Sequence, residues 1–223
     1  MNILEIEIQT DDLVETEIFY SDILGLQLAS KGQDSISFLA GQSTLTFIES
    51  VKLNPKYHFA FNIPYNKLDE AIIWTSAKLD LIKNADNAIV VNFESWNAKA
   101  IYFFDNNGNI LEFIARFDLD NDSDKPFSIS SIQSISEIGI VADEPIKLAD
   151  KLVEENNLYF CAKGSKSEKF VTLGNDNGLF IIVETNRKWF PTEQQAEKHY
   201  TKIKISTEGL TRVITMNEES VSR

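Results

Sequence analysis

The chain opens with an alternation of hydrophobic and polar residues. Residues 4–8 alternate strictly, with the period of a half-buried β-strand. Hydrophobic residues then recur at helical spacing over residues 13–24, between an aspartate that can cap a helix and a glycine that can end it. Short strands are predicted at 35–39 and 44–49. This order predicts a small unit in which a strand and a helix precede further strands.

The same order of elements recurs along the chain. The second unit is predicted from a strand at 58–63, a helix at 67–79 and strands at 88–93, 99–104 and 109–115. The third is predicted from a strand at 137–141, a helix at 145–155 and strands at 170–173 and 179–184. Residues 200–205 predict the opening strand of a fourth unit that is incomplete. Since one such unit cannot bury its own hydrophobic face, we expect the units to pair.

The repeats predict an α+β fold of tandem βαβββ modules that form curved mixed sheets, with a degenerate second half. A polar, acidic segment at 117–128 is interpreted as a linker. We therefore expect the first and second units to pair side by side within residues 1–116, and a degenerate third unit with a partial fourth at 129–223. The polar end of the chain, residues 216–223, is expected to be disordered.

Composition narrows the classes of partner. The chain has 34 acidic and 21 basic residues and a net charge of −13, which disfavours nucleic acid and anionic membranes. It has no apolar run of 18 residues and no basic leader at its start, so we expect neither a membrane span nor a signal peptide. Cys161 is the only cysteine and cannot form an internal disulfide. These features favour a cytoplasmic protein.

Two segments carry a family resemblance. The first comprises Thr-Asp-Asp-Leu at 10–13, Phe-Tyr at 19–20 and Ile-Leu-Gly-Leu at 23–26. It resembles the opening of the vicinal oxygen chelate superfamily, whose members include glyoxalase I, bleomycin- and fosfomycin-resistance proteins and extradiol dioxygenases. The second, residues 102–113, contains an Asp-Asn-Asn-Gly turn and resembles the closing strand–turn–strand segment of that family. The resemblance is good over 1–116 and weak over 129–206.

The resemblance implies a set of metal ligands. In this superfamily, paired units form a cup, and ligands project from the first and last strand of each unit. The matching positions are Glu5 and Thr46 in the first unit and His58 and Glu112 in the second. Thr46 departs from the pattern because a neutral hydroxyl is a weak ligand, so water is expected there.

The third unit departs further from the pattern. Glu137 stands at its first-strand position and Ile182 at the closing one. Since an aliphatic side chain cannot bind a metal ion, we expect this half to be scaffold, a pairing surface or a metal-free pocket.

Strand periodicity supports the same site independently. Glu5, His58 and Glu112 each lie on the strand face opposite a hydrophobic row. If those rows pack under the helices, the three side chains converge. One imidazole and two carboxylates suit Zn²⁺, Mn²⁺, Fe²⁺ or Ni²⁺. The alternatives are an exposed Glu5, a hydrogen-bonded or surface His58, and a Glu112 that is paired with Arg116.

Further polar and aromatic residues are expected to line a substrate pocket: Thr46, Asn62, Asn92, Glu94, Trp96 and Tyr102. For Trp96 and Tyr102, the alternative is ordinary packing. The segment Trp189-Phe190-Pro191 is interpreted as an ordered loop that covers an edge and does not belong to a site.

The sequence leaves several functions open. The first is a metal-dependent lyase or isomerase that chelates two neighbouring oxygens of a small oxygen-rich substrate, with Glu5 or Glu112 as the base. The alternative is a metal-free small-molecule-binding protein of the bleomycin-resistance type. A ring-cleaving dioxygenase is less favoured, because His58 is the only histidine in the first two units. A homodimer that covers the incomplete fourth unit is a further expectation.

Overall fold

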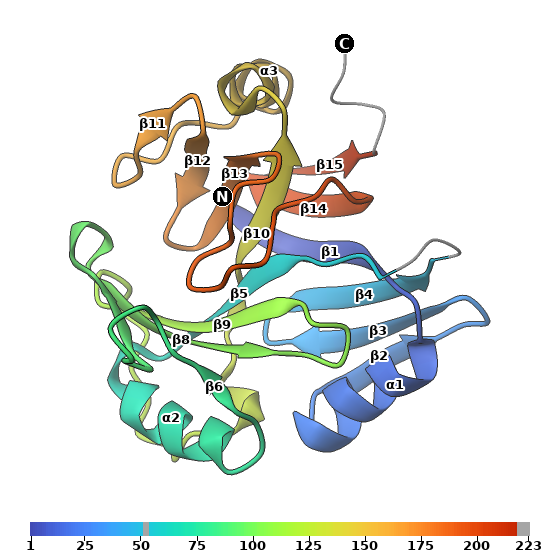
Figure 1. The fold of residues 1–223 in the computed structure, drawn as a ribbon, viewed down its shortest axis with the longest axis vertical. Helices are drawn as coiled ribbons and strands as arrows, with labels where there is room; N and C mark the ends of the chain where they lie inside the picture. Colours follow the sequence, from blue (N-terminus) through green and yellow to red (C-terminus); the bar gives the residue numbers. More distant parts are fainter. Residues whose placement is uncertain (51–53, 218–223) are drawn as a thin grey trace.

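The strands of this protein form one continuous mixed sheet. The computed structural model describes residues 1–50 and 54–217, and the 15 strands within them are hydrogen-bonded into a single curved array flanked by helices (Figure 1). The predicted α+β architecture of repeated βαβββ modules is confirmed.

The first unit begins with a long strand and a capped helix. Its elements are β1 (Asn2–Thr10), α1 (Leu13–Glu17), a π-helical segment η1 (Ile18–Ile23), β2 (Gln27–Lys31), β3 (Ser35–Ala40) and β4 (Ser43–Glu49). Asp12 caps α1, since its carboxylate accepts hydrogen bonds from the backbone N–H groups of Val14 and Glu15, both at 2.9 Å. Strand β2 was not predicted, because all five of its residues are exposed and it buries no alternating row.

The second unit repeats this order with additional short elements. These are β5 (His58–Ile63), η2 (Tyr65–Lys67), α2 (Leu68–Ser76), β6 (Leu81–Ile82), β7 (Val91–Phe93), η3 (Glu94–Trp96), β8 (Ala98–Phe104) and β9 (Ile110–Arg116). The strand expected at 88–93 is reduced to the three residues of β7. Residues 117–128, which were predicted to be a linker, contain no helix or strand.

The third unit is complete and the fourth is a two-stranded fragment. Their elements are η4 (Ile129–Ser131), β10 (Ser134–Ala142), α3 (Pro145–Asn156), β11 (Lys166–Ser167), β12 (Phe170–Asn175), β13 (Gly178–Glu184), β14 (Thr201–Thr207) and β15 (Leu210–Met216). Of the segment 216–223 that was expected to be disordered, Met216 ends β15, and residues 218–223 lie outside the described residues.

The units pair in an order that differs from their order in the chain. Strand β5 runs antiparallel to β10, and β1 runs antiparallel to β14, so the second unit pairs with the third and the first with the fourth. Strands β1 and β10 meet only where Ile3 faces Ile135. The expected side-by-side pairing of the first two units is therefore corrected, because β10 separates β1 from β5. Periodicity predicts which face a strand buries but says nothing about which strand occupies its edge.

The helices cover the face that carries the main hydrophobic core. Helix α1 contacts β3 and β4, α2 contacts β8 and β9, and α3 contacts β10, β12 and β13. Figure 1 places α1 and α2 at one end of the molecule and α3 at the other. None of the helices in the described part of the chain is long and apolar enough to cross a bilayer.

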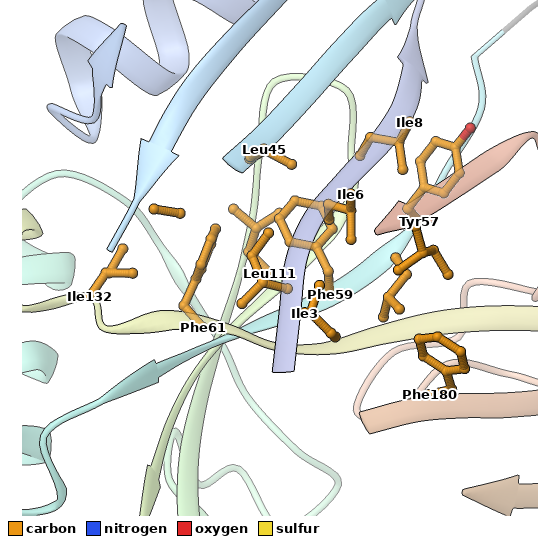
Figure 2. Close-up of a cluster of buried hydrophobic side chains, with 14 of the residues drawn as sticks. Ile3, Ile6, Ile8, Leu45, Tyr57, Phe59, Phe61, Leu111, Ile132 and Phe180 are labelled. Carbon is orange, nitrogen blue, oxygen red and sulfur yellow. The ribbon is translucent and has the colours of Figure 1, made fainter. Parts of the chain in front are cut away.

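The main hydrophobic core contains side chains from strands of the first, second and third units. Figure 2 shows side chains that come together from β1, β4, β5, β9 and β13, among them Ile6, Leu45, Phe59, Leu111 and Phe180. All five are fully buried. Since successive strand residues point to opposite faces, this packing directs their neighbours to the other side of the sheet.

Candidate metal centre

Strand alternation places a second set of side chains on the face opposite the main core. Along β9, Leu111 and Phe113 pack into the main core, whereas Ile110 and Ile114 belong to a smaller cluster on the other face. Glu112 therefore projects into this smaller cluster. On β5, Phe59 packs into the main core, and the residues on either side of it point the other way.

Three side chains with ligand chemistry meet on this face. They are His58 from β5, Glu112 from β9 and Glu137 from β10, with exposed fractions of 6%, 2% and 8%. One potential ligand atom from each lies within 4.8 Å of the others. His58 Nε2 is 3.6 Å from Glu112 Oε2. The group spans the junction of the second and third units.

His58 is oriented through its other ring nitrogen. Nδ1 lies 3.1 Å from the carbonyl oxygen of Ile110, so it carries the proton and donates to that oxygen. This leaves the lone pair of Nε2 directed at the group. Burial lowers the pKa of His58, while the charge of Glu137 and the bond to Ile110 act in the opposite sense. Both the burial and the tautomer suit a neutral imidazole ligand.

Glu112 lies in an environment that disfavours its charge. Burial raises the pKa of Glu112 well above its usual value, and the negative charge of Glu137 raises it further. The positive charge of Arg116 and a hydrogen bond donated by Tyr102 act in the opposite sense. A nearby divalent cation would favour the charged carboxylate.

Glu137 is held by a buried guanidinium. Arg116 is fully buried and forms an ion pair with Oε1 of Glu137. Its Nε and Nη2 also donate to Ser136 Oγ at 3.2 Å, and Nη1 lies 3.5 Å from Asp176 Oδ1. Arg116 therefore pairs with Glu137 and Asp176, and not with Glu112 as the alternative interpretation had it. The second oxygen of Glu137 remains available as a ligand.

A cavity of about 270 Å³ adjoins the three side chains. Its lining consists mostly of aromatic and charged residues: His58, Phe93, Trp96, Tyr102, Glu112, Ile114, Arg116, Glu137, Phe170, Ile181, Arg187, Trp189 and Phe190. Small-molecule sites commonly combine apolar walls with a few convergent polar groups.

The segment between β13 and β14 forms one wall of the cavity. The Trp189 ring lies 5.3 Å from the His58 ring, and the Phe190 ring lies 6.0 Å from the Tyr102 ring. The expectation that the segment Trp189-Phe190-Pro191 does not belong to a site is therefore corrected, since Trp189 and Phe190 line this cavity. Trp189 packs over Gly139 of β10, where the lack of a side chain makes room for the indole.

A first-row divalent ion fits these residues. A neutral imidazole nitrogen and two carboxylates are donors that Zn²⁺, Mn²⁺, Fe²⁺ and Ni²⁺ accept. Three protein ligands beside an open cavity leave coordination positions for water or a substrate, which is typical of catalytic sites and not of structural ones.

Glu5 and Thr46, which the sequence placed in the same site, lie together elsewhere. Thr46 Oγ1 donates to Glu5 Oε1 at 3.0 Å, and Glu5 stands opposite Lys204 on β14. Glu5 is half-buried and does not belong to the group formed by His58, Glu112 and Glu137. The physical reason is the pairing of β1 with β14, which turns the polar face of the first unit toward the fourth.

The remaining predicted pocket residues divide between two places. Trp96 and Tyr102 line the cavity. Asn92 and Glu94 are absent from its lining. Asn62 lines a separate hollow of about 610 Å³, and its Nδ2 donates to the carbonyl oxygen of Asp176 at 3.1 Å.

Glu137 is the group member that sequence reasoning passed over. The sequence places Glu137 at the first-strand position of the third unit, but it predicts no metal site in that unit because the closing position is aliphatic. The pairing of β10 with β13 confirms that the closing ligand position is aliphatic, but the residue there is Ile181 and not Ile182. In the second unit, Glu112 on the closing strand pairs with Ala60 on the first strand. In the third unit, the residue that pairs with the corresponding Gly139 is Ile181, so Ile181 occupies the closing ligand position and lines the cavity. Ile182 packs in the main core. Of the four positions from which ligands could project here, Ile181 occupies one and His58, Glu112 and Glu137 occupy the other three.

Comparisons with known proteins bear on the fold. No protein-family model and no curated protein matches the sequence. A crystal structure from Bacillus subtilis subsp. subtilis str. 168, of a protein provisionally named a dioxygenase, is 16% identical with a TM-score of 0.60. The match covers 82% of this chain and 63% of that one, so the chain spans less than two thirds of the Bacillus protein.

Two other solved structures match about half of the chain. A glyoxalase/bleomycin resistance protein/dioxygenase from Alicyclobacillus acidocaldarius is 20% identical over 52% of this chain and 92% of that one, with a TM-score of 0.42. A single-site mutant of the fosfomycin-resistance protein FosX from Listeria monocytogenes, in complex with Mn(II) and a dihydroxypropylphosphonic acid, is 19% identical over 52% and 90%, with a TM-score of 0.41. The fold assignment rests on the longer match. The chain shares the fold of the Bacillus protein, and this fold agrees with the glyoxalase-like arrangement of βαβββ modules that the sequence predicted.

Proposed function

We propose that this protein binds a divalent transition-metal ion through His58, Glu112 and Glu137, and uses it in a lyase or isomerase reaction on a small oxygen-rich molecule. The observation that carries the proposal is the convergence of three buried ligand groups on the wall of a cavity. The three groups come from β5, β9 and β10, which are neighbours in the sheet, so hydrogen-bonded strands hold them at a fixed spacing.

The charges around the site favour a cation. Two buried carboxylates lie within 4.8 Å of each other, and the ion pair of Arg116 offsets only one of them. Burying an uncompensated carboxylate is costly. A divalent ion would compensate Glu112 and leave a net positive site for an anionic oxygen ligand.

The bound ion would act as a Lewis acid toward two neighbouring oxygens of the substrate. The protein's own residues would orient and enclose the substrate. Tyr102 lines the cavity with Glu112, where its phenol favours the charged carboxylate, and the ion pair with Arg116 holds Glu137 in place. Trp189 and Phe190 limit the access of water from one side. Glu112 is the candidate to accept a proton from the substrate, and Glu5 lies outside this group in the fold, so it does not share that role.

Equilibrium dialysis tests the proposal. Tag-free protein is dialysed against Mn²⁺, Ni²⁺, Zn²⁺ or anaerobic Fe²⁺, and its metal content is measured by mass spectrometry. We expect about one equivalent of at least one ion, and its loss in His58→Ala. Acetohydroxamate, a small bidentate oxygen ligand, is then titrated calorimetrically. It should bind the loaded protein and not the metal-free one. Equal binding to both forms would contradict the chelation step.

A metal-free binding protein is the second candidate. The observation that favours it is the ion pair of Glu137 with Arg116, since a carboxylate that already has a cation has less need of a metal. This function predicts ligand binding that persists unchanged after treatment with a chelator.

Ring cleavage is a third and less favoured candidate. The name of the Bacillus protein suggests it, but iron oxygenases of the 2-His-1-carboxylate type use two histidines, and this group contains one.

A further inference from the structure

A second hollow lies where the first three units and the linker meet. It has a volume of about 610 Å³ and shares no lining residue with the cavity beside His58. Its walls come from the start of β1, the turn between β3 and β4, the end of β5, residues 119–121, the start of β10 and the turn between β12 and β13. Volumes of this size at the junction of structural units commonly hold small molecules.

Hydrogen bonds tie the walls of this hollow together. Gln133 N–H donates to the Asn62 carbonyl at 2.9 Å, and Gln42 N–H donates to the Gln133 carbonyl at 2.7 Å. The side chains of Asn121 and Gln133 are also bonded to each other, with Asn121 Nδ2 donating to Gln133 Oε1 at 2.7 Å. The hollow is therefore formed in advance, and a ligand needs to order little of the protein when it binds.

Asn62 contributes an acceptor without a partner to the wall. Asn62 is 2% exposed, and its Nδ2 donates to the carbonyl oxygen of Asp176 at 3.1 Å. Since a carbonyl oxygen only accepts, this bond fixes which end of the amide is Oδ1. Oδ1 has no hydrogen-bond partner among the described residues. Leaving a buried polar atom unpaired is costly, so this oxygen favours a ligand that donates a hydrogen bond.

The other groups around the hollow favour a positive charge. The amide nitrogens of Asn121 and Gln133 already donate, to Gln133 Oε1 and to the Asn121 carbonyl. Among the described residues, Asp120 brings an exposed carboxylate to the rim, and no lysine or arginine lines the hollow. The net charge of −13 also attracts cations to the surface. An anion would be repelled here, whereas an ammonium group carries both the charge and the N–H donors that these residues lack.

We propose that this hollow is a second ligand site, which binds a small protonated amine. An N–H group of the ligand donates to Asn62 Oδ1, and the carboxylate of Asp120 offsets the positive charge. The site is independent of the proposed metal centre and stands even if that centre binds no metal. If the hollow held only water, neither the charge nor the N–H groups of a small molecule would affect its affinity.

Three probes of matched length separate charge from hydrogen bonding. Protonated 1,4-diaminobutane has both the charge and the N–H donors. Its hexamethylated form keeps the charge and has no N–H group, and 1,4-butanediol has donors without charge. Each is titrated into ¹⁵N-labelled full-length protein with a chelator present, so that no amine–metal complex contributes. Binding is followed by the NMR shifts of the amides of Asn62 and Gln133.

We expect the diamine to bind about tenfold or more tightly than the diol and the hexamethylated form, because only the diamine makes a charge-assisted hydrogen bond. Asn62→Ala should remove this preference, whereas Asn92→Ala, an exposed amide outside the hollow, should keep it. Asp120→Asn is at an exposed position and keeps the fold testable. It should weaken the diamine about threefold and leave the diol unchanged, and Asp122→Asn, outside the hollow, should weaken neither.

Two results would overturn the site. The first is an equal affinity of the diamine and the hexamethylated form, with shifts spread over the acidic surface and unchanged in Asp120→Asn, since this describes a nonspecific attraction to a negative protein. The second is the absence of any shift at Asn62 and Gln133 with all three probes at millimolar concentration. Neither result depends on the metal content, so the failure of this site is distinguishable from the failure of the metal centre.

Discussion

Asp105 shows how a single buried carboxylate links two units. It lies in the turn between β8 and β9 and accepts hydrogen bonds from the backbone N–H groups of Asn107 and Asn109 at 2.9 and 2.8 Å. The side chains of Asn109 and Tyr20 donate to its other oxygen at 2.7 Å. Burial raises the pKa of Asp105 to about 6, although these four hydrogen bonds favour the charged form. The turn is thereby tied to the π-helical segment of the first unit.

This pKa gives stability a predictable pH dependence. Since the pKa in the folded state exceeds its usual value of 3.8, the folded protein binds this proton more tightly than the unfolded chain. The contribution is fully present below about pH 4 and is lost as the pH rises through 6, by up to about 3 kcal/mol. The free energy of unfolding, measured with urea between pH 4 and 7, should fall less steeply with rising pH in Asp105→Asn than in the wild-type protein. Tyr20 and Lys56, the nearby titratable groups, are retained in both proteins. Parallel pH profiles would contradict the assignment.

Tyr102 should affect the metal site through Glu112. Tyr102→Phe removes the phenol O–H that favours the charged carboxylate, while keeping the ring in the cavity wall. Loss of such a partner of a ligand typically lowers metal affinity by about tenfold or more. Mn²⁺ titration should show this weakening, and Tyr65→Phe, outside the cavity, should not show it. Unchanged affinity in Tyr102→Phe would mean that Glu112 is not a ligand.

At the scale of strands and helices, hydrophobic periodicity predicted the face of the sheet on which a side chain lies, but not which strand pairs with each edge. Alternation in β5 and β9 placed His58 and Glu112 opposite hydrophobic rows, and the structure brings them together. The same argument applied to β1, but Glu5 reaches a different part of the sheet because β14 and not β5 lies beside β1. Edge partners depend on long-range contacts that no local pattern encodes. Glu137 needed that pairing, since only the contact of β5 with β10 carries it to His58.

The packing of the loop onto β10 can be tested at Gly139. A Cβ atom there would lie 2.5 Å from Trp189 Cη2, so Gly139→Ala must displace the indole from the cavity wall. Overpacking of this kind costs about 1–3 kcal/mol. Urea unfolding and tryptophan fluorescence should both change. The control is Gly32→Ala, whose Cβ meets only Ser35. An unchanged fluorescence spectrum and stability in Gly139→Ala would show that the loop does not pack as described.

At the scale of the molecule, the site requires both halves of the chain. Glu137 comes from the third unit, and Arg187, Trp189 and Phe190 follow β13. The sequence predicted the candidate site within residues 1–116 because the resemblance is strongest there. The third unit was not included because the residue at its closing ligand position is aliphatic. The sequence alone could not show that the third unit, despite its aliphatic ligand position, lines the same cavity as the second unit.

Truncation tests this interdependence. A fragment of residues 1–128 lacks β10 and β14, so β5 and β1 each lose the antiparallel partner that covers one edge. We expect no cooperative thermal transition by circular dichroism and no metal binding, and we expect both to return when residues 129–223 are co-expressed. A fragment that melts cooperatively and retains one metal ion would contradict the pairing of the second unit with the third.

The most direct test of the central claim compares two glutamates. Metal content after dialysis with Mn²⁺ is measured for wild-type protein, Glu137→Gln and Glu5→Gln. We expect about one equivalent in wild-type protein and in Glu5→Gln, and a loss in Glu137→Gln, since of these two glutamates Glu137 lies with His58 and Glu112 and Glu5 does not. Loss of metal in Glu5→Gln with retention in Glu137→Gln would contradict a site between the second and third units.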